Sequence, residues 1–462
     1  MRTHPGRSSL PSLRRQARAA PSFETLERRE LPSLGKPGLE LLVRFRDNTP
    51  SAAIARVFNR LGARPLESFP QGPTVVSFAS PVSRRAAADV LALDSRVVYA
   101  QANQRIRVQG DPAAASDFAR QWGLGQHNGI DIGAREAWRL SSGRSSPIVA
   151  VLDSGIDLRH PEFAGRIWTN NLETPGDGID NDKNGYVDDV VGWDFVKNTN
   201  NVQDDEGHGT HVAGIIGADG IRVAGVNPTV RIMPLKMIAA DGSGTIDDAV
   251  RAIHYAVDKG ARVINVSWTD TDWTRALGDA LRYARRHNVV VVAAAGNESA
   301  NNDVVPSYPA NAPNRNIISV ASINQVGRLS SFSNYGLRTV AIAAPGSNIL
   351  STVPSGYAVY SGTSMATPFV TGVVSLLIGQ DPSLNVRQLT TRVLATARPL
   401  ANLTMRVATG GMVNAINALN GRLPSRQAAR AAGLVLTTGR IALKALGPVA
   451  RLASFPSPSD AH

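Results

Sequence analysis

The chain has 462 residues, 43% of them hydrophobic and 19% charged, which is the composition of a globular protein rather than a disordered or fibrous one. This length accommodates one large domain or two to three smaller ones. No apolar run reaches the roughly 20 residues that a membrane helix requires, so we expect no transmembrane segment. The complete absence of cysteine excludes disulfides, thiolate zinc sites and cysteine nucleophiles.

The net charge of +12 would favour a nucleic-acid partner if the basic residues formed a stripe, but they are concentrated at the two ends of the chain. Residues 1–30 hold seven Arg against three Glu, and residues 421–462 hold five Arg and one Lys against one Asp. The residues between these ends are close to neutral. We therefore expect no nucleic-acid partner and interpret 421–462 as a basic C-terminal extension.

Two segments precede the main part of the chain. Residues 1–38 are rich in Arg, Ser and Pro without apolar periodicity, which predicts a disordered leader or targeting segment. Residues 39–110 then alternate between strand-like and helix-like patterns. The predicted β-α-β-α-β order indicates a small, ferredoxin-like α+β domain, with strands at 39–45, 73–79 and 97–108 and helices at 51–61 and 83–93.

From residue 147 onward, apolar strand patterns alternate with amphipathic helix patterns. The strands are expected at 147–153, 230–237, 262–268 and 289–294, and the helices at 245–259 and 272–287. Such alternation predicts an α/β fold in which helices cover both faces of a parallel sheet. In sheets of this kind the site lies at the carboxyl ends of the strands, where Asp153 and Asn297 are expected.

Three separate segments carry residues whose chemistry depends on one another. Asp153 ends a strand in VAVLDSGID, His208 lies between two glycines in GHGTHVAG, and Ser364 begins a helix in SGTSMATP. Taken alone, each residue is interpreted as a cap of a turn or helix. Taken together they complement one another, because a serine nucleophile needs a base, histidine supplies one near neutral pH, and a carboxylate orients the histidine.

The sequence resembles the subtilisin-like serine proteases (the subtilase or peptidase S8 family) in AVLDSGID, HGTHVAG, SGTSMATPFVTG and in AAAGNE, which contains Asn297. The order Asp, His, Ser is also the order found in subtilisin. The resemblance covers about residues 121–419 and implies a peptidase domain at 118–420 with a seven-stranded parallel sheet. It implies a serine endopeptidase that hydrolyses peptide bonds through an acyl-enzyme.

The resemblance assigns catalytic and substrate-binding roles to particular residues. It makes Ser364 the nucleophile, His208 the general base and then acid, and Asp153 the orienting carboxylate. It makes the Asn297 amide and the Ser364 backbone N–H the two donors to the oxyanion. Substrate would pair as an added strand between two edges, and an apolar or broad preference is expected at the residue before the scissile bond. The edge residues are Ser267, Trp268, Thr269, Ala294, Ala295 and Gly296.

The insert at 179–189, IDNDKNGYVDD, predicts a structural calcium site, because oxygen-bearing side chains alternate ahead of Gly185. Val191 stands where an EF-hand has glutamate, so the insert is not an EF-hand, and a solvated acidic loop is the alternative. Related subtilases carry similar inserts. The family's strongest calcium site, which would include Glu162, is not expected because the loop at 215–226 is short. The candidate ligands are Asp180, Asp182, Asn184, Tyr186, Asp188 and Asp189.

Residues 39–110 resemble the inhibitor-type propeptide of subtilases. The resemblance implies a zymogen that cleaves itself between residues 108 and 118 and whose own propeptide is a partner in cis. It also implies protein and peptide substrates and a bacterial-type secreted or cell-surface location, although the leader lacks an apolar signal core. We expect a monomer.

Other functions fit only parts of the sequence. An inactive, peptide-binding homologue would lack a catalytic position, and all four are present. An esterase of another hydrolase fold predicts a Gly-x-Ser-x-Gly turn, which Ala366 breaks here. A metal pair at His208 and His211 lacks a third ligand at zinc spacing. The basic extension leaves binding to an anionic surface as a further alternative.

Overall fold

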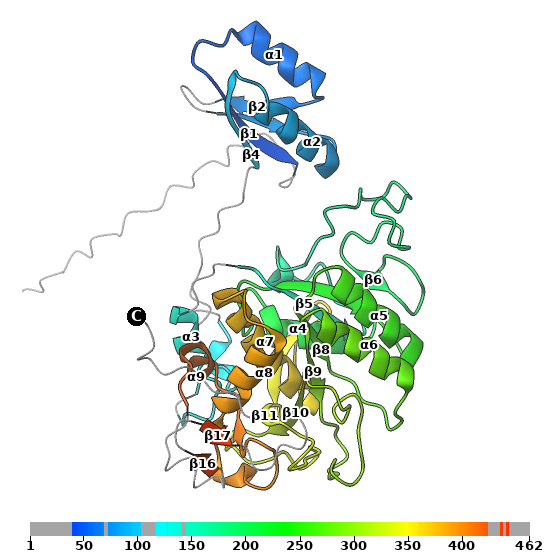
Figure 1. Cartoon of the computed structure of the whole chain (residues 1–462), viewed down its shortest axis with the longest axis vertical. Coiled ribbons are helices and arrows are strands. Elements are labelled where there is room, and N and C mark those ends of the chain that lie inside the picture. The colour runs from blue at the N-terminus through cyan, green and yellow to red at the C-terminus, as the bar shows by residue number, and fades with distance from the viewer. Residues whose placement is uncertain are drawn as a thin grey trace, which may run out of the picture. The chain divides into compact units, whose positions relative to one another are not determined.

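The computed structural model describes residues 39–68, 73–102, 116–126, 128–140, 145–423, 435–437 and 440–442. The chain forms two compact units, Met1–Arg105 and Ile106–His462 (Figure 1). The leader expected at 1–38 lies outside the described residues, as does most of the basic extension. Within that extension, β16 (Val435–Thr437) pairs antiparallel with β17 (Arg440–Ala442).

The first unit is a four-stranded antiparallel sheet in the order β2-β3-β1-β4, accompanied by two helices. Its βαββαβ order is that of a ferredoxin-like fold. Leu41 and Val43 pack against Phe58 and Leu91 of the two helices in its core. The elements are β1 (Glu40–Phe45), α1 (Ser51–Arg60), β2 (Arg64–Ser68), β3 (Thr74–Ser77), α2 (Pro81–Ala92) and β4 (Val97–Ala102).

The sequence analysis missed β2. Its residues read RPLES, and the side chains of Arg64, Pro65, Leu66 and Ser68 are all exposed, so these four produce no alternating pattern of burial. It lies at the edge of the sheet, where proline is tolerated. An edge strand of this kind carries little sequence signal.

The second unit is built on a sheet whose described strands follow the order β14-β15-β11-β10-β9-β8-β5-β7-β6. Neighbouring strands are parallel, except β14 against β15. The longer strands are β5 (Ile148–Asp153), β7 (Arg231–Lys236), β8 (Val263–Val266), β9 (Val290–Ala294), β10 (Ile317–Ile323) and β11 (Ile342–Pro345). Seven strands were expected; the nine include three of two residues, β6 (Trp193–Asp194), β14 (Arg398–Pro399) and β15 (Gly411–Met412).

Successive side chains of the strands are buried on opposite faces of this sheet, which confirms the α/β prediction. Val149 and Val151 of β5 belong to the core that includes α4 (His208–Gly217) and α7 (Thr363–Gln380). Ala150 and Leu152 belong to the core on the other face. That second core includes α5 (Ile246–Asp258) and α6 (Arg275–Arg286), which lie together on one side of the sheet in Figure 1.

Helix α7 is the central helix of the first of these cores. Among the described residues it is the one helix long and apolar enough to cross a membrane, and 89% of it is buried inside the protein. Pro368 lies close enough to its first turn that few helical hydrogen bonds are lost. The remaining elements of this unit include α3 (Ala134–Leu140), β12 (Ile349–Val353), β13 (Gly356–Tyr360), α8 (Val386–Ala395) and α9 (Ala415–Asn420).

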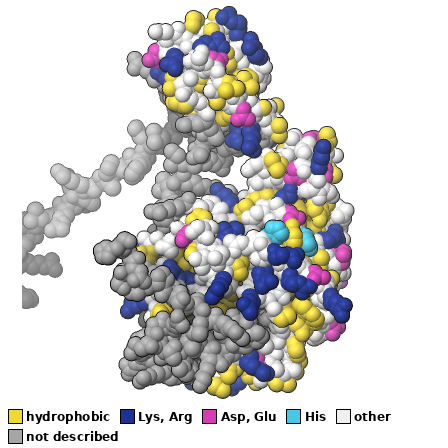
Figure 2. All heavy atoms as spheres, in the orientation of Figure 1, with side chains coloured by type: hydrophobic (Ala, Val, Ile, Leu, Met, Phe, Trp, Pro, Cys, Tyr) yellow, Lys and Arg dark blue, Asp and Glu magenta, His cyan; other side chains and the backbone are white. Residues whose placement is uncertain are grey.

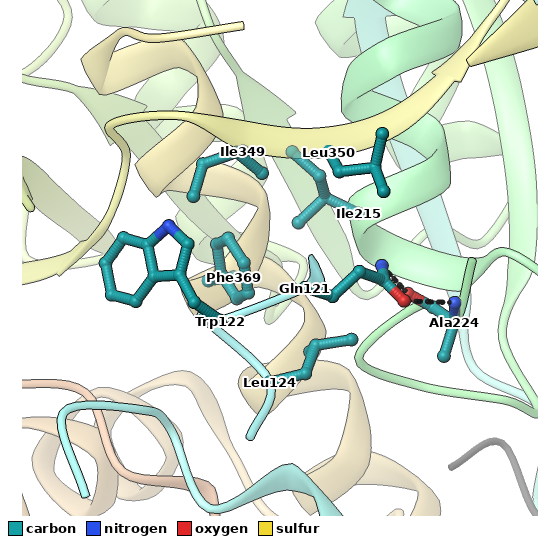
Figure 3. Close-up of a pocket in the computed structure, with 9 residues that line it drawn as sticks. Gln121, Trp122, Leu124, Ile215, Ala224, Ile349, Leu350 and Phe369 are labelled. Carbon is teal, nitrogen blue, oxygen red and sulfur yellow. Dashed lines mark hydrogen bonds between the residues drawn. The ribbon is translucent and has the colours of Figure 1, made fainter. Parts of the chain in front are cut away.

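Near the start of the described part of this unit, the side chains of Gln121 and Trp122 hydrogen-bond to later segments of the chain beside α4 and α7. The Gln121 side chain donates to the Ala224 carbonyl (2.8 Å) and accepts from its N–H (2.7 Å). The Trp122 indole donates to the Ser347 carbonyl (3.0 Å). Figure 3 shows these two side chains beside Ile215 of α4 and Phe369 of α7.

The exposed face of α5 and α6 carries many basic side chains, as Figure 2 shows. Arg275, Arg285 and Arg286 of α6 are exposed, and Arg282 pairs with the exposed Asp279. Acidic side chains therefore interrupt the basic ones on this face.

Candidate active site

Asp153 and His208 come together where β5 ends and α4 begins. Asp153 is the last residue of β5, and His208 is the first residue of α4. Gly207, with φ of +107°, takes the left-handed backbone conformation that turns the chain into the helix. A Cβ atom on Gly209 would lie 2.2 Å from the Gly155 carbonyl oxygen, so only glycine allows α4 to approach β5 this closely.

The Asp153 carboxylate binds the His208 ring directly. Oδ1 of Asp153 accepts a hydrogen bond from Nδ1 of His208 (2.8 Å) and another from the Ser154 N–H (2.8 Å). The other oxygen, Oδ2, is buried and has no hydrogen-bond partner among the described residues. Since Asp153 is fully buried, its charge acts on the imidazole with little screening by water.

This carboxylate changes the protonation of His208. Burial alone would favour the neutral ring, but the charge and hydrogen bond of Asp153, with smaller contributions from Glu206 and Asp204, raise the pKa of His208 to about 9. The Nδ1 proton is therefore held against Asp153, and the ring is able to act as a base in the molecules whose Nε2 has lost its proton. That arrangement suits a general base that becomes an imidazolium during the reaction.

Asp204 fixes the start of α4. Its carboxylate accepts from the N–H groups of Gly207 (2.8 Å) and Thr210 (2.9 Å) and from the Ser154 hydroxyl (2.9 Å). The Ser154 hydroxyl in turn accepts from the Gly209 N–H (2.9 Å). Asp204 thus joins the β5 turn to α4, a role that sequence reasoning missed because these donors follow no fixed spacing.

The Ser364 segment meets Asn297 at the N-terminus of α7. Oδ1 of Asn297 accepts from the N–H and hydroxyl of Thr363 (2.9 and 3.0 Å), which leaves its Nδ2 as the free donor end. A Cβ atom on Gly362 would lie 3.5 Å from the Ser364 nitrogen and 3.7 Å from Asn297 Nδ2. The two donors therefore border one small space. The Ser364 hydroxyl itself donates to the Ser267 carbonyl (2.9 Å).

The expected substrate edges follow the neighbouring parallel strands β8 and β9: Ser267 comes directly after β8, and Ala294 is the last residue of β9. Ser267 is held in place because its hydroxyl accepts from Asn265 (2.9 Å) and donates to the Ser364 carbonyl (2.9 Å). Beyond Thr269 the edge is already paired, since Asp270 exchanges two 2.8 Å backbone hydrogen bonds with Tyr308. Thr269 is therefore the last residue of this edge before the pairing begins, and the carbonyl of the buried Ser267 is occupied by the Ser364 hydroxyl.

The second edge has little exposed surface. Ala294 and Ala295 are 1% and 0% exposed, so their side chains belong to the core. The Ala295 carbonyl accepts from the side chains of Asn302 (2.8 Å) and Asn334 (3.2 Å), which fixes the backbone that leads to Gly296. Gly296 is also buried, and Asn297 is the first exposed residue after β9.

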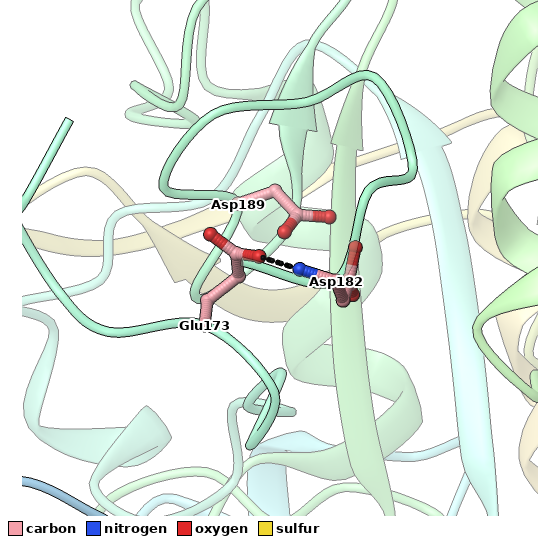
Figure 4. Close-up of side chains that lie close together, drawn as sticks. All are labelled: Glu173, Asp182 and Asp189. Atoms are coloured by element: carbon pink, nitrogen blue, oxygen red, sulfur yellow. Dashed lines mark hydrogen bonds between the residues drawn. The ribbon is translucent and has the colours of Figure 1, made fainter. Parts of the chain in front are cut away.

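Three carboxylates, Glu173, Asp182 and Asp189, form a group that we call the acidic cluster (Figure 4). One oxygen from each lies within 4.8 Å of the others, so the cluster could hold a metal ion. Oδ1 of Asp182 is buried without a hydrogen-bond partner among the described residues. The Lys259 ammonium, 11% exposed, pairs with Asp182 and lies 3.6 Å from Asp189.

The surroundings of the acidic cluster shift its protonation in two directions. Burial, reinforced by the charges of Asp189 and Asp182, raises the pKa of Glu173. Burial acts on Asp182 in the same sense, but hydrogen bonds from Lys259 and Asn170 lower the pKa of Asp182 overall. The Tyr255 hydroxyl donates to Asp189 (2.6 Å) and ties the insert to α5.

Of the six predicted calcium ligands, only Asp182 and Asp189 belong to the acidic cluster. Asp188 accepts from the Gly176 N–H (2.7 Å) and other loop N–H groups, and Asp180 accepts from the Gly185 N–H (2.7 Å). The other two are Asn184, whose amide donates to Asp189 (2.8 Å), and Tyr186, whose ring packs on Trp193, Phe195 and Tyr255. Sequence reasoning missed Glu173 and Lys259, which lie outside the insert.

Glu162 is fully buried, and its neighbours are hydrogen-bond donors. Its carboxylate accepts four backbone N–H groups from the loop at 220–223, at 2.7 to 3.0 Å, and the Tyr357 hydroxyl at 3.1 Å. Donors at these positions leave no lone pairs for a cation. The Glu162 carboxylate therefore fixes the loop at 220–223 through hydrogen bonds to the backbone.

Comparison with known proteins agrees with this geometry. The subtilase family model matches residues 144–422. The thermophilic serine proteinase of Bacillus sp. (strain AK1) is 32% identical over 354 residues, which cover 76% of this chain and 80% of that protein. Thermitase of Thermoactinomyces vulgaris is 40% identical over 267 residues, which cover 57% of this chain and 85% of that protein.

A solved structure shows the same fold. The crystal structure of a cold adapted subtilisin-like serine proteinase superposes with a TM-score of 0.50 at 28% identity, covering 66% of this chain and 97% of that chain. The family match extends over more than half of the chain, and it spans all four predicted catalytic positions. The chain therefore belongs to the subtilase family of serine proteases, which are hydrolases.

Proposed function

We propose that this serine protease cleaves peptide bonds within proteins through a triad of Asp153, His208 and Ser364. The observation that carries the proposal is the 2.8 Å hydrogen bond between a fully buried Asp153 and the ring of His208. A carboxylate in that position fixes the histidine tautomer and stabilises the imidazolium that forms when the serine is deprotonated. The convergence of Asn297 Nδ2 and the Ser364 N–H beside Gly362 supplies the second half of the machinery.

In the proposed reaction the Ser364 hydroxyl turns from the Ser267 carbonyl to Nε2 of His208. Its oxygen attacks the substrate carbonyl carbon while the proton passes to Nε2. The developing oxyanion accepts from Asn297 and the Ser364 N–H, an interaction worth about 2.7–4 kcal/mol per donor. The imidazolium then protonates the leaving amine, and water hydrolyses the acyl-enzyme by the same steps in reverse.

Labelling with a fluorophosphonate tests this assignment. The wild-type protein should be labelled stoichiometrically at Ser364, and the Ser364→Ala variant should not be labelled at all. The matched control is Ser361→Ala, which removes a hydroxyl three residues away and should leave labelling unchanged. Label on another serine in the wild-type protein would overturn the assignment.

The proposed substrate binds as an extended strand along Ser267, Trp268 and Thr269. The pairing of Asp270 with Tyr308 ends this edge after Thr269. Residues on the opposite side are Ala294, Ala295 and Gly296, whose backbone rather than side chains would face the peptide. We propose an apolar or broad preference at the residue before the scissile bond, which a library of fluorogenic peptides would measure.

We propose that the first unit is an autoinhibitory propeptide and that residues 39–110 are released by cleavage between 108 and 118. Its support is the ferredoxin-like βαββαβ order and the slow folding expected of a large parallel sheet, for which a template is useful. The Ser364→Ala variant should accumulate as uncleaved precursor. Cleavage in this interval by the purified variant would show that another protease performs it.

A structural calcium ion is proposed at the acidic cluster. The three carboxylates suit calcium, which prefers oxygen ligands, and Oδ1 of Asp182 is buried without a hydrogen-bond partner among the described residues. Lys259 would have to move away from Asp182 for an ion to bind. Chelation should lower the melting temperature by ligand linkage, and a melting curve that does not change with calcium would remove the metal from the proposal.

Export to the cell surface or medium as a monomer is proposed from the family membership. A relative from Bacillus subtilis, named cell wall-associated protease, is 35% identical over 314 residues, covering 65% of this chain and 32% of that protein. N-terminal sequencing of protein recovered from the culture medium tests export and cleavage position together. Recovery of the protein from the cell interior alone would contradict this location.

A further inference from the structure

His211, the second histidine of the HGTH motif, joins α4 to the β12–β13 hairpin. It lies three residues after His208 and is fully buried. Its Nε2 is 3.1 Å from the Ile349 carbonyl oxygen in β12 and 3.2 Å from the Ala358 carbonyl oxygen in β13. Carbonyl oxygens only accept hydrogen bonds, so Nε2 must carry the proton and donate to both strands.

The other ring nitrogen of His211, Nδ1, does not take part in this connection. Nδ1 is buried and has no hydrogen-bond partner among the described residues. The ring stacks on Tyr360, with centroids 4.4 Å apart and planes 10° from parallel. Burial lowers the pKa of His211 to about 3, against the opposing effect of its hydrogen bond to Ala358. His211 is therefore a neutral donor, not a second base.

The hairpin that His211 holds leads directly to the proposed nucleophile. β13 ends at Tyr360, four residues before Ser364. Two further hydrogen bonds fasten β12 to α4: the Ser351 hydroxyl donates to the His211 carbonyl (2.8 Å), and the Thr352 hydroxyl donates to the Thr210 carbonyl (2.7 Å). Because α4 begins at His208, the same few contacts connect the segment carrying the base to the segment carrying the nucleophile.

We propose that His211 is a positioning residue that sets the distance between His208 and Ser364 by donating its single Nε2 proton to both strands of the hairpin. The inference rests on the proposed roles of His208 and Ser364. It assigns a function to the second histidine of the motif that is separate from proton transfer and from metal binding. A displacement of about 1 Å at such a position lowers turnover by about 10²-fold.

Two substitutions separate the donor from the ring. His211→Phe keeps an aromatic ring against Tyr360 and removes the donor, whereas His211→Gln keeps an N–H donor near the Nε2 position and removes the ring. We expect kcat per titrated active site to fall by about 10²-fold in the Phe variant and by less than about tenfold in the Gln variant, with KM nearly constant in both. The pH at which kcat/KM reaches half its maximum should not move.

The matched control is Tyr357→Phe, which removes a hydroxyl bound to Glu162 from the same strand, β13. It should lower the melting temperature slightly and leave kcat unchanged. A Phe variant with wild-type kcat, or a Gln variant as slow as the Phe variant, would overturn the inference. If His211→Phe does not mature, normal maturation and turnover of His211→Gln support the inference, and failure of both variants counts against it.

The outcome is distinguishable from failure of the proposed function. If Ser364 of the wild-type protein is not labelled by the fluorophosphonate, the proposed triad itself is wrong. Normal labelling together with a fully active His211→Phe variant removes only the positioning role. Counting active sites by titration also separates slow turnover from loss of folded protein, since misfolded molecules do not titrate.

Discussion

Two regions of the second unit gather carboxylates, and they use them differently. Beside His208, the carboxylates of Asp153 and Asp204 are surrounded by neutral donors, chiefly backbone N–H groups and the Ser154 hydroxyl. In the acidic cluster the carboxylates face one another and the Lys259 ammonium. Among the described residues no lysine or arginine pairs with Asp153 or Asp204, so the one cation they can face is the ring of His208 itself, whereas the second region contains a permanent counterion.

The difference teaches what each region contributes. A buried carboxylate with neutral neighbours acts strongly on a group whose charge changes, because little solvent or counterion screens it. The charge of a carboxylate paired with lysine is already compensated by its partner, and the pair holds two segments of the chain together. Substitutions near His208 should therefore lower turnover while the protein stays folded. Substitutions at the acidic cluster should lower the stability of the protein while turnover per active site stays unchanged.

The largest effect is expected from Asp153→Asn. The neutral amide can no longer stabilise the imidazolium or select the tautomer of His208, so kcat should fall by about 10⁴-fold, a loss of the size known for triad enzymes including a subtilisin. The measurement is kcat with a peptide substrate, alongside the melting temperature. Asp157→Asn is the matched control, since this carboxylate is equally buried nearby and binds the Ser355 N–H (3.0 Å). The control should change stability but leave kcat within about threefold.

Lys259→Met should have the opposite pattern. It removes the cation and leaves Asp182 and Asp189 buried with an uncompensated charge, which should lower the free energy of unfolding by about 3–5 kcal/mol. Chemical denaturation measures the loss, and kcat per active site should remain unchanged. Added calcium should restore more stability to this variant than to the wild type. Lys197→Met is the control, because Lys197 is 62% exposed and its removal should change the stability little. An equal loss of stability in both variants would contradict the contrast between the two regions.

Gly362→Ala tests the space between the two oxyanion donors. The added methyl group would lie 3.5 Å from the Ser364 nitrogen and 3.7 Å from Asn297 Nδ2, at ordinary contact distances that the fold tolerates. It should nevertheless occupy the place of the oxyanion and lower kcat by about 10²–10³-fold without lowering the melting temperature. Gly356→Ala is the control, because a Cβ atom there meets nothing within 4 Å. Equal activity of both variants would mean that the oxyanion lies elsewhere.

The sequence predicted well the elements that bury an apolar stripe, such as β5, β9 and α5. It missed β2 and the two-residue strands, which are defined by backbone pairing rather than by side-chain pattern, and it also named no strand at β10 or β11 although both are buried. It identified Asp153 and His208 because motif glycines force a close approach. It also located the acidic insert.

It missed Glu173 of the acidic cluster and Lys259 beside it, although it named Asp182 and Asp189. Lys259 and Asp182 are 77 residues apart, and Glu173 precedes the insert, so their meeting depends on how the loop folds over α5. The carboxylate of Asp188 has the expected spacing but accepts N–H groups of its own loop instead. Alternation of acidic residues thus predicts an oxygen-rich loop, whereas the ligand set depends on which backbone donors the loop satisfies first.

The pH dependence of activity and stability is expected to show the smallest effect, and it tests how strongly Asp153 acts on His208. Because Asp153 raises the pKa of His208 to about 9, the resting ring is protonated at neutral pH and cannot act as a base. We expect kcat/KM to rise about tenfold per pH unit up to about pH 9. Stability should change in the opposite direction: the charged ring stabilises the folded state fully below its unfolded pKa of about 6.5, and this contribution is lost as pH rises through about 9. Glu206→Gln, which removes a smaller charge that also raises this pKa, should shift the activity profile toward lower pH. A profile already flat at neutral pH would show that Asp153 does not act on the ring as its burial implies.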